Sequence, residues 1–152
     1  MPYQNTSILC TLLTLIQEGV RTHLGMTTPG FPNMFMVYSP QAPTALSNGP
    51  PIIEVQVEWI IKTMDKMKKE GIKELDPQAE PAKQWRESIQ EMNQKTLYPL
   101  ENSWYMGANI PGKVREQLVY LGGVGMYNEE INKALDGWTG FEVTKGEAIK
   151  AN

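Results

Sequence analysis

The longest periodic run of apolar residues predicts a helix in the first half of the chain, over about 53–70. Apolar side chains recur there at steps of three and four residues, so they line one helix face: Ile53, Val57, Ile60, Ile61, Met64 and Met67. Two prolines suit the first turn, where a missing N–H costs little, and Ser47 or Asn48 can cap it. Gly71 is well placed to end the helix.

A short apolar run before this helix predicts a buried strand at Met34–Tyr38, because turn-forming residues flank it on both sides. The proline-rich loop over 39–51 would then lie at the carboxyl end of the strand, where open α/β sheets bind ligands. One clear apolar strand cannot form a sheet by itself. The chain therefore looks like part of a core rather than the whole of one.

The second half of the chain shows weaker patterns. A helix is expected from Pro81 to Leu97, with one apolar face and a proline at 99 that stops it. The other expected elements are an extended loop at 21–32, a loop at 101–113, a strand at Gln117–Leu121, a short helix at Met126–Leu135 and a terminal strand at Phe141–Val143.

Composition narrows the classes of function. The chain has 152 residues, enough for about one domain. Its net charge of -3 and pI near 5.2 argue against a broad basic face for nucleic acid. A single cysteine excludes an intrachain disulfide, and a single histidine excludes His–His zinc spacings, so we assign no metal ligands.

The apolar stretch Ile8–Ile16 is too short to span a bilayer, which needs ~20 residues. No basic residue precedes it, as a secretory signal would require. A short buried helix or an ill-fitting leader remains open for this stretch. We expect no membrane segment and a cytoplasmic location.

Two features that could carry chemistry favour ordinary structural roles. Residues 107–114 come within one residue of the phosphate-binding G-x-x-x-x-G-K-[ST] loop, but Val114 lacks the hydroxyl that holds magnesium. His23 lies in a loop with no acidic residue or cysteine near it in sequence, which favours a surface or hydrogen-bonding histidine over a catalytic one. We assign no catalytic residue.

Four segments in order carry a resemblance to a known family: RTHLG at 21–25, GFPNMF at 30–35, PTALSNGP at 43–50 and NSWYMGANIPGK at 102–113. Together they resemble the carboxyl-terminal part of the FAD-dependent Baeyer–Villiger monooxygenases of the phenylacetone, cyclohexanone and steroid monooxygenase type. The resemblance runs from about Glu18 to Phe141, and residues 1–17 have no counterpart.

The resemblance implies an α/β fragment, helix-rich with few strands, from a flavoprotein with two dinucleotide-binding domains. Residues 18–152 would be the C-terminal part of the FAD-binding domain, with a cofactor-covering loop at 101–113 and a C-terminal tail. The strand at Met34–Tyr38 would complete a sheet begun elsewhere in a longer chain.

The family oxidises ketones to esters or lactones with FAD, NADPH and O2, so a ketone of the secondary-metabolite or steroid kind is the implied substrate. The G-x-G-x-x-G fingerprints for FAD and NADPH are absent from this sequence. We therefore expect a truncated chain that is inactive alone and binds FAD weakly or not at all. The alternative is a non-catalytic stand-alone protein that binds or stabilises a full-length relative.

The resemblance also implies the site residues. The loop after the strand and the start of the next helix would lie beside the flavin ring, where free N–H groups and the helix dipole suit an electron-rich ligand. The implied cofactor contacts are Pro40, Gln41, Thr44, Leu46, Ser47, Asn48 and Trp104, and the implied substrate-lining residues are Thr44, Ala45 and Leu46. The alternative for Trp104 is a buried loop anchor. Two departures from the family pattern are Ser39, where a glycine is usual, and Val114, where a proline is usual.

Overall fold

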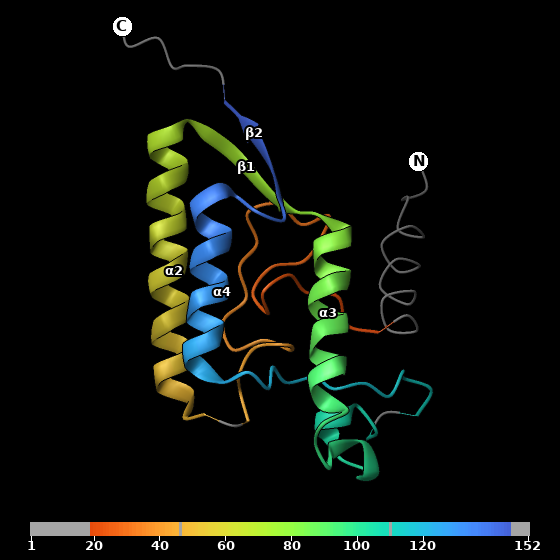
Figure 1. Cartoon of the computed structure of the whole chain (residues 1–152). Helices are drawn as coiled ribbons and strands as arrows, with labels where there is room; N and C mark the ends of the chain where they lie inside the picture. The colour runs from red at the N-terminus through yellow and green to blue at the C-terminus, as the bar shows by residue number, and fades with distance from the viewer. Residues whose placement is uncertain (1–18, 46, 110, 147–152) are drawn as a thin grey trace, which may run out of the picture.

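The computed structural model describes residues 19–45, 47–109 and 111–146 (Figure 1). The described residues contain three α-helices, two strands and two short 3-10 turns, joined by loops and irregular segments. Their bounds are α2 Gly49–Glu70, β1 Ile72–Pro77, α3 Ala79–Asn93, η1 Tyr98–Leu100, η2 Trp104–Met106, α4 Gly123–Gly137 and β2 Phe141–Lys145. The expectation of a helix-rich α/β piece with few strands is confirmed.

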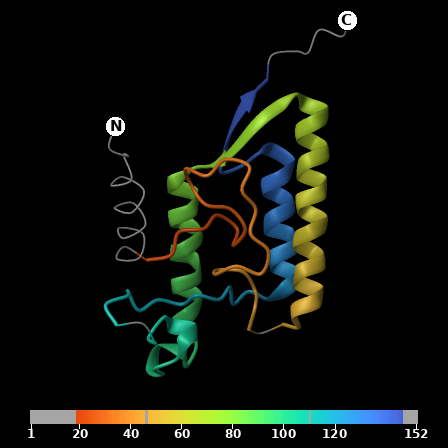
Figure 2. The ribbon, with the colours of Figure 1, turned by 180° about the vertical axis from the view of Figure 1, so that it is seen from behind.

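Helices α2 and α4 lie side by side, and α3 stands across from them on the other side of the irregular segment that precedes α2 (Figures 1 and 2). Strands β1 and β2 cross one end of the molecule as an antiparallel pair, with Leu75 opposite Val143 and Pro77 opposite Phe141. The predicted terminal strand is thus confirmed. Its partner β1 was not expected, because IKELDP mixes charged residues into a short run.

Aromatic side chains from α2, α3 and α4 form the centre of the core. Trp59 of α2 donates its indole N–H to the carbonyl of Ile131 in α4 at 2.7 Å. Trp85 of α3 stacks on Tyr120 with ring centroids 5.0 Å apart. Burial of these large rings supplies the main driving force that holds the three helices together.

The predicted helix over 53–70 is confirmed as α2, and Gly71 ends it in the left-handed conformation at φ 67. The helix begins after Asn48, whose side chain makes no capping hydrogen bond. Its buried residues are Ile52, Gln56, Trp59, Thr63 and Met67. Most of the apolar face expected from the sequence points outward instead, and we call its exposed members the outer stripe: Ile53, Val57, Ile61 and Met64.

The prediction of a buried strand at Met34–Tyr38 is wrong: this segment is irregular and half-buried or exposed. Positive φ angles at Asn33 (60) and Tyr38 (58) bend the backbone at either end. Extended backbone also needs a neighbouring strand to pair with, and β1 and β2 pair with each other instead. We call Met34–Tyr38 the edge segment.

The edge segment still alternates like a strand in its hydrogen bonding. Met36 N donates to Met26 O at 2.7 Å, and Tyr38 N donates to Gln56 Oε1 at 2.7 Å. The N–H groups of Phe35 and Val37, on the opposite side, have no hydrogen-bond partner among the described residues. This side therefore presents free donors as the edge of a sheet does.

The remaining expectations are met in part. The helix expected from Pro81 begins two residues earlier, at Ala79, and ends at Asn93 rather than Leu97. The helix expected at Met126–Leu135 is present and longer. The strand expected at Gln117–Leu121 is wrong, because that segment runs irregularly. The stretch Ile8–Ile16 lies outside the described residues. Within them, no helix has the length and apolar character needed to cross a membrane.

Candidate functional site

A pocket of about 480 Å³ lies between the loop before α2 and the segment that follows η1. We call it the loop pocket; its lining consists of Tyr38, Ser39, Pro40, Thr44, Ala45, Trp104, Tyr105, Leu118 and Val119. Four residues that the family resemblance marked, Pro40, Thr44, Ala45 and Trp104, therefore meet in one place. They come from two segments that are far apart in the sequence.

Tyr38 fixes the first wall of the loop pocket. Its hydroxyl donates to the carbonyl of Thr44 at 2.9 Å, which closes the loop on itself. Ser39, next along the chain, donates its hydroxyl to the carbonyl of Gly25 at 2.5 Å. A Cβ on Gly49 would lie 3.4 Å from the Tyr38 hydroxyl, so the start of α2 lies beside this wall.

The second wall is built around the 3-10 turn η2. Ser103 caps this turn, because its hydroxyl accepts from Tyr105 N at 3.1 Å. Gly107 ends the turn at φ 64 and donates its N–H to Trp104 O at 3.0 Å. A left-handed residue is needed at that point, and glycine takes this conformation without steric cost.

Trp104 differs from the other tryptophans in exposure and bonding. It is 60% exposed, which overturns the alternative of a buried loop anchor. The indole N–H groups of the other three donate to protein oxygens: Trp59 to Ile131, Trp85 to Gln41 and Trp138 to Glu70. The indole N–H of Trp104 has no partner among the described residues, so it remains available to a ligand.

Three other marked residues lie near the loop pocket without lining it. Gln41 is fully buried, and its side chain bonds to residues behind the pocket. Ser47 donates its hydroxyl to Pro43 O at 2.6 Å, and Asn48 is exposed at the start of α2. Leu46 lies outside the described residues.

The start of α2 offers fewer free N–H groups than a usual helix. The first four N–H groups of a helix have no partner within it. Two of the first three residues of α2 are Pro50 and Pro51, which have no N–H. This helix start therefore presents mainly the positive end of the helix dipole to a nearby ring.

No charged side chain is among the described residues that line the loop pocket. A neutral, largely apolar wall with a few polar groups fits a flat ring or the body of a ketone, as ligand sites usually do. The same lining does not fit a pyrophosphate, which calls for positive charge or a glycine-rich helix start. The described residues also contain no cluster of three or more potential metal ligands.

His23 does not belong to this pocket and has a structural environment. Its ring packs edge-on against Phe141 at 4.9 Å, and its Nε2 lies 3.4 Å from Thr139 O. Burial lowers the pKa of His23 to about 4, so the ring is neutral at pH 7. This agrees with the expectation of a hydrogen-bonding rather than a catalytic histidine.

Sequence reasoning missed five lining residues: Tyr38, Ser39, Tyr105, Leu118 and Val119. Tyr38 was assigned to the end of a strand, and Leu118 and Val119 to the middle of another. The signal for Tyr105 was present, because it lies inside the same NSWYMGANIPGK segment as Trp104.

Comparison with known proteins finds no matching family model, but several relatives. An FAD-binding monooxygenase of Aspergillus aculeatus is 37% identical over 133 residues, which cover 88% of this chain and 22% of that protein. A Baeyer–Villiger monooxygenase of Pseudooceanicola batsensis is 40% identical over 116 residues, 76% of this chain and 21% of that protein. The fold matches cyclohexanone monooxygenase from Rhodococcus sp. Phi1 bound to NADP+, with a TM-score of 0.77 and 38% identity over 83% of this chain and 24% of that one.

These matches confirm the resemblance, and they also show that it concerns only a part of each relative. The chain spans less than a quarter of the length of these relatives. In sequence and in fold, the chain is similar to a segment of the FAD-binding Baeyer–Villiger monooxygenases.

Proposed function

We propose that this chain is the part of a flavin-dependent ketone monooxygenase that closes over the rings of FAD and NADPH and lines the ketone site. The observation that carries the proposal is the loop pocket, in which Pro40, Thr44 and Ala45 face Trp104 in a neutral setting. When bound, FAD would supply oxygen activation and NADPH the hydride, because no protein side chain performs that chemistry.

The chain's own contribution would be to orient the reactants and exclude water. The hydroxyl of Thr44 and the indole N–H of Trp104 have no hydrogen-bond partner among the described residues, and they stand on opposite walls. Both are free to hold a carbonyl or amide oxygen of a ligand. Leu118 and Val119 supply an apolar wall, which suits a cyclic ketone of the steroid or secondary-metabolite kind.

The same pocket explains why the chain would be inactive alone. Its described lining carries no positive charge, so the phosphates of FAD and NADPH must be held elsewhere. Contacts to the rings alone leave most of each cofactor without support. We therefore propose that the chain acts together with the remainder of a monooxygenase, on the same polypeptide or on a separate one.

The edge segment and the outer stripe are the surface on which that remainder would dock. The free N–H groups of Phe35 and Val37 can pair with an added strand. A groove of about 380 Å³, lined in part by Phe35 and Met64, continues from the edge segment onto α2. The outer stripe is a contiguous apolar patch of the kind that marks protein contacts. This surface also supports the second candidate function, a non-catalytic chain that stabilises a full-length relative.

The test is a hybrid enzyme in which residues 18–141 replace the matching part of a working cyclohexanone monooxygenase. Trp104→Ala should raise the apparent NADPH requirement, or uncouple NADPH oxidation from ester formation, by on the order of ten- to a hundredfold. Trp138→Ala is the matched control, because Trp138 lies at the end of α4 and bonds to Glu70 instead. It should lower stability and leave cofactor kinetics unchanged.

Two results would oppose the proposal, one from the hybrid enzyme and one from gel filtration of the isolated chain. Unchanged NADPH kinetics and coupling in an active Trp104→Ala hybrid would remove Trp104 from the cofactor site. An isolated chain that keeps stoichiometric FAD through gel filtration would show that it holds the phosphates itself.

A further inference from the structure

The two walls of the loop pocket are joined by backbone hydrogen bonds directly behind the lining residues. Gln41 N donates to Leu118 O at 2.7 Å, and Tyr120 N donates to Ala42 O at 3.0 Å. These bonds pair the loop before α2 with the irregular segment that was expected to be a strand. The distance between the walls therefore depends on whatever holds Gln41 in place.

Within the second wall, the segment 116–118 is joined to η2 by two more backbone hydrogen bonds. Leu118 N donates to Tyr105 O at 2.9 Å, and Glu116 N donates to Met106 O at 3.0 Å. Both acceptors lie in the turn that carries Trp104. A shift of Glu116 or Leu118 would thus move Trp104 relative to the opposite wall.

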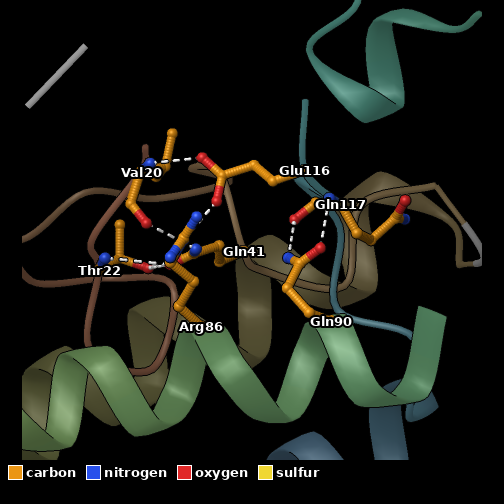
Figure 3. A network of polar contacts seen from close by, with 7 residues as sticks. All are labelled: Val20, Thr22, Gln41, Arg86, Gln90, Glu116 and Gln117. Atoms are coloured by element: carbon orange, nitrogen blue, oxygen red, sulfur yellow. Dashed lines mark hydrogen bonds and ion pairs between the residues drawn. The ribbon is translucent and has the colours of Figure 1, made fainter. Parts of the chain in front are cut away.

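Gln41 is the centre of a buried network (Figure 3). Its Oε1 accepts from Thr22 N at 3.0 Å and from Thr22 Oγ1 at 2.7 Å, and its Nε2 donates to Val20 O at 2.9 Å. Its carbonyl accepts from the indole N–H of Trp85 at 3.2 Å. Its φ of 67 is rare for a residue with a side chain and persists only where the surroundings fix it.

Glu116 continues the network to the second wall. It is 2% exposed, and its Oε1 accepts from Val20 N at 2.6 Å. Its other carboxylate oxygen accepts from Nε of Arg86 in α3. Val20 thus bonds to Gln41 through its carbonyl and to Glu116 through its N–H, which links the two walls by side chains as well as by backbone (Figure 3).

We infer that Gln41 and Glu116 are positioning residues that set the geometry of the loop pocket without lining it. The polar atoms of the Gln41 side chain are engaged behind the pocket, so its part in cofactor binding is indirect. The consequence for catalysis rests on the proposed function. The geometric claim does not, because it concerns only how two segments of this chain are held together.

Hydrogen exchange measured by NMR on the full chain, with no cofactor present, tests the inference. Gln41→Met and Glu116→Met should each accelerate exchange of the Leu118 and Tyr120 amides by roughly tenfold or more, since each removes side-chain hydrogen bonds that hold the walls. Thr22→Val keeps the side-chain shape and removes one bond to Gln41, so its effect should be intermediate. Gln84→Met is the control, since Gln84 is exposed on α3.

Three results would overturn the inference. One is exchange at wild-type rates for both amides in both variants. Another is acceleration of the α2 amides by the same factor, which would show a role in global folding only. The third is a wild-type chain whose Leu118 and Tyr120 amides lack protection. Failure of the proposed function would appear elsewhere, in the NADPH kinetics of the Trp104→Ala hybrid.

Discussion

Two adjacent isoleucines at the start of α2 should respond very differently to truncation. Ile52 is fully buried, whereas Ile53 belongs to the outer stripe and is 40% exposed. Ile52→Ala removes apolar groups from a packed core and should lower the free energy of unfolding by about 2–5 kcal/mol. That is a large share of the ~5–15 kcal/mol that stabilises a typical domain.

Ile53→Ala should cost about 1 kcal/mol or less, because much of the Ile53 side chain is already in water and the change gains helix propensity. Urea unfolding followed by circular dichroism, repeated over a range of protein concentrations, measures both variants under one condition. Ile53→Ala should also reduce any self-association, since it shrinks the exposed patch.

Equal losses for the two variants in dilute monomeric protein would refute this account of α2. The hybrid enzyme sharpens the comparison, because the remainder of the monooxygenase should cover the outer stripe there. Ile53→Ala should then approach the cost of Ile52→Ala. A cost that stays near the isolated-chain value would mean that the outer stripe is not the docking surface.

Two further predictions concern pH and backbone conformation. Since burial lowers the pKa of His23 from 6.5 to about 4, the unfolded chain binds the proton first as pH falls. The free energy of unfolding is therefore unaffected by His23 above pH 6.5 and falls between pH 6.5 and pH 4, by about 1.4 kcal/mol per pH unit at most. In urea unfolding measured across this pH range, His23→Gln should remove that fall. A fall of the same size in His23→Gln would show that His23 is not its cause. Gly71→Ala should cost about 1 kcal/mol, because its φ is positive but the added Cβ meets open space. Gly25→Ala should cost clearly more, because the Cβ would meet Ala42 N at 2.6 Å; equal melting temperatures for the two variants would show that the loop around Gly25 yields.

The helices could be predicted because their signals are local. Periodicity located α2 and α3, and Gly71 marked the end of α2 through a conformation that glycine favours. Periodicity alone could not say which side of α2 is buried. The buried side carries two polar residues, Gln56 and Thr63, and the burial of Gln56 depends on a partner far along the chain, the hydroxyl of Tyr127 at 2.8 Å from Gln56 Nε2.

The strands were predicted poorly because pairing is not local. The run at Met34–Tyr38 has the composition of a strand, yet it stays irregular, and no strand of the described residues pairs with it. The run at Ile72–Pro77 lacks that composition, yet it forms β1 because β2 returns to pair with it. Strand propensity expresses fit to a pleated neighbour, so composition alone misleads in both directions.

The candidate site depends on the same kind of distant pairing. Thr44 and Trp104 carry no local pattern that brings them together, and only the family resemblance marked both. Gln41 N donates to Leu118 O in the segment after η2, and the Gln41 side chain bonds to Thr22 and Val20. The free indole N–H of Trp104 is the part that no sequence pattern reveals. It becomes evident only in the structure, where the indole N–H groups of the other three tryptophans are hydrogen-bonded to protein oxygens. Because Trp104 is 60% exposed and lines the loop pocket, a ligand in that pocket can reach its unpaired indole N–H.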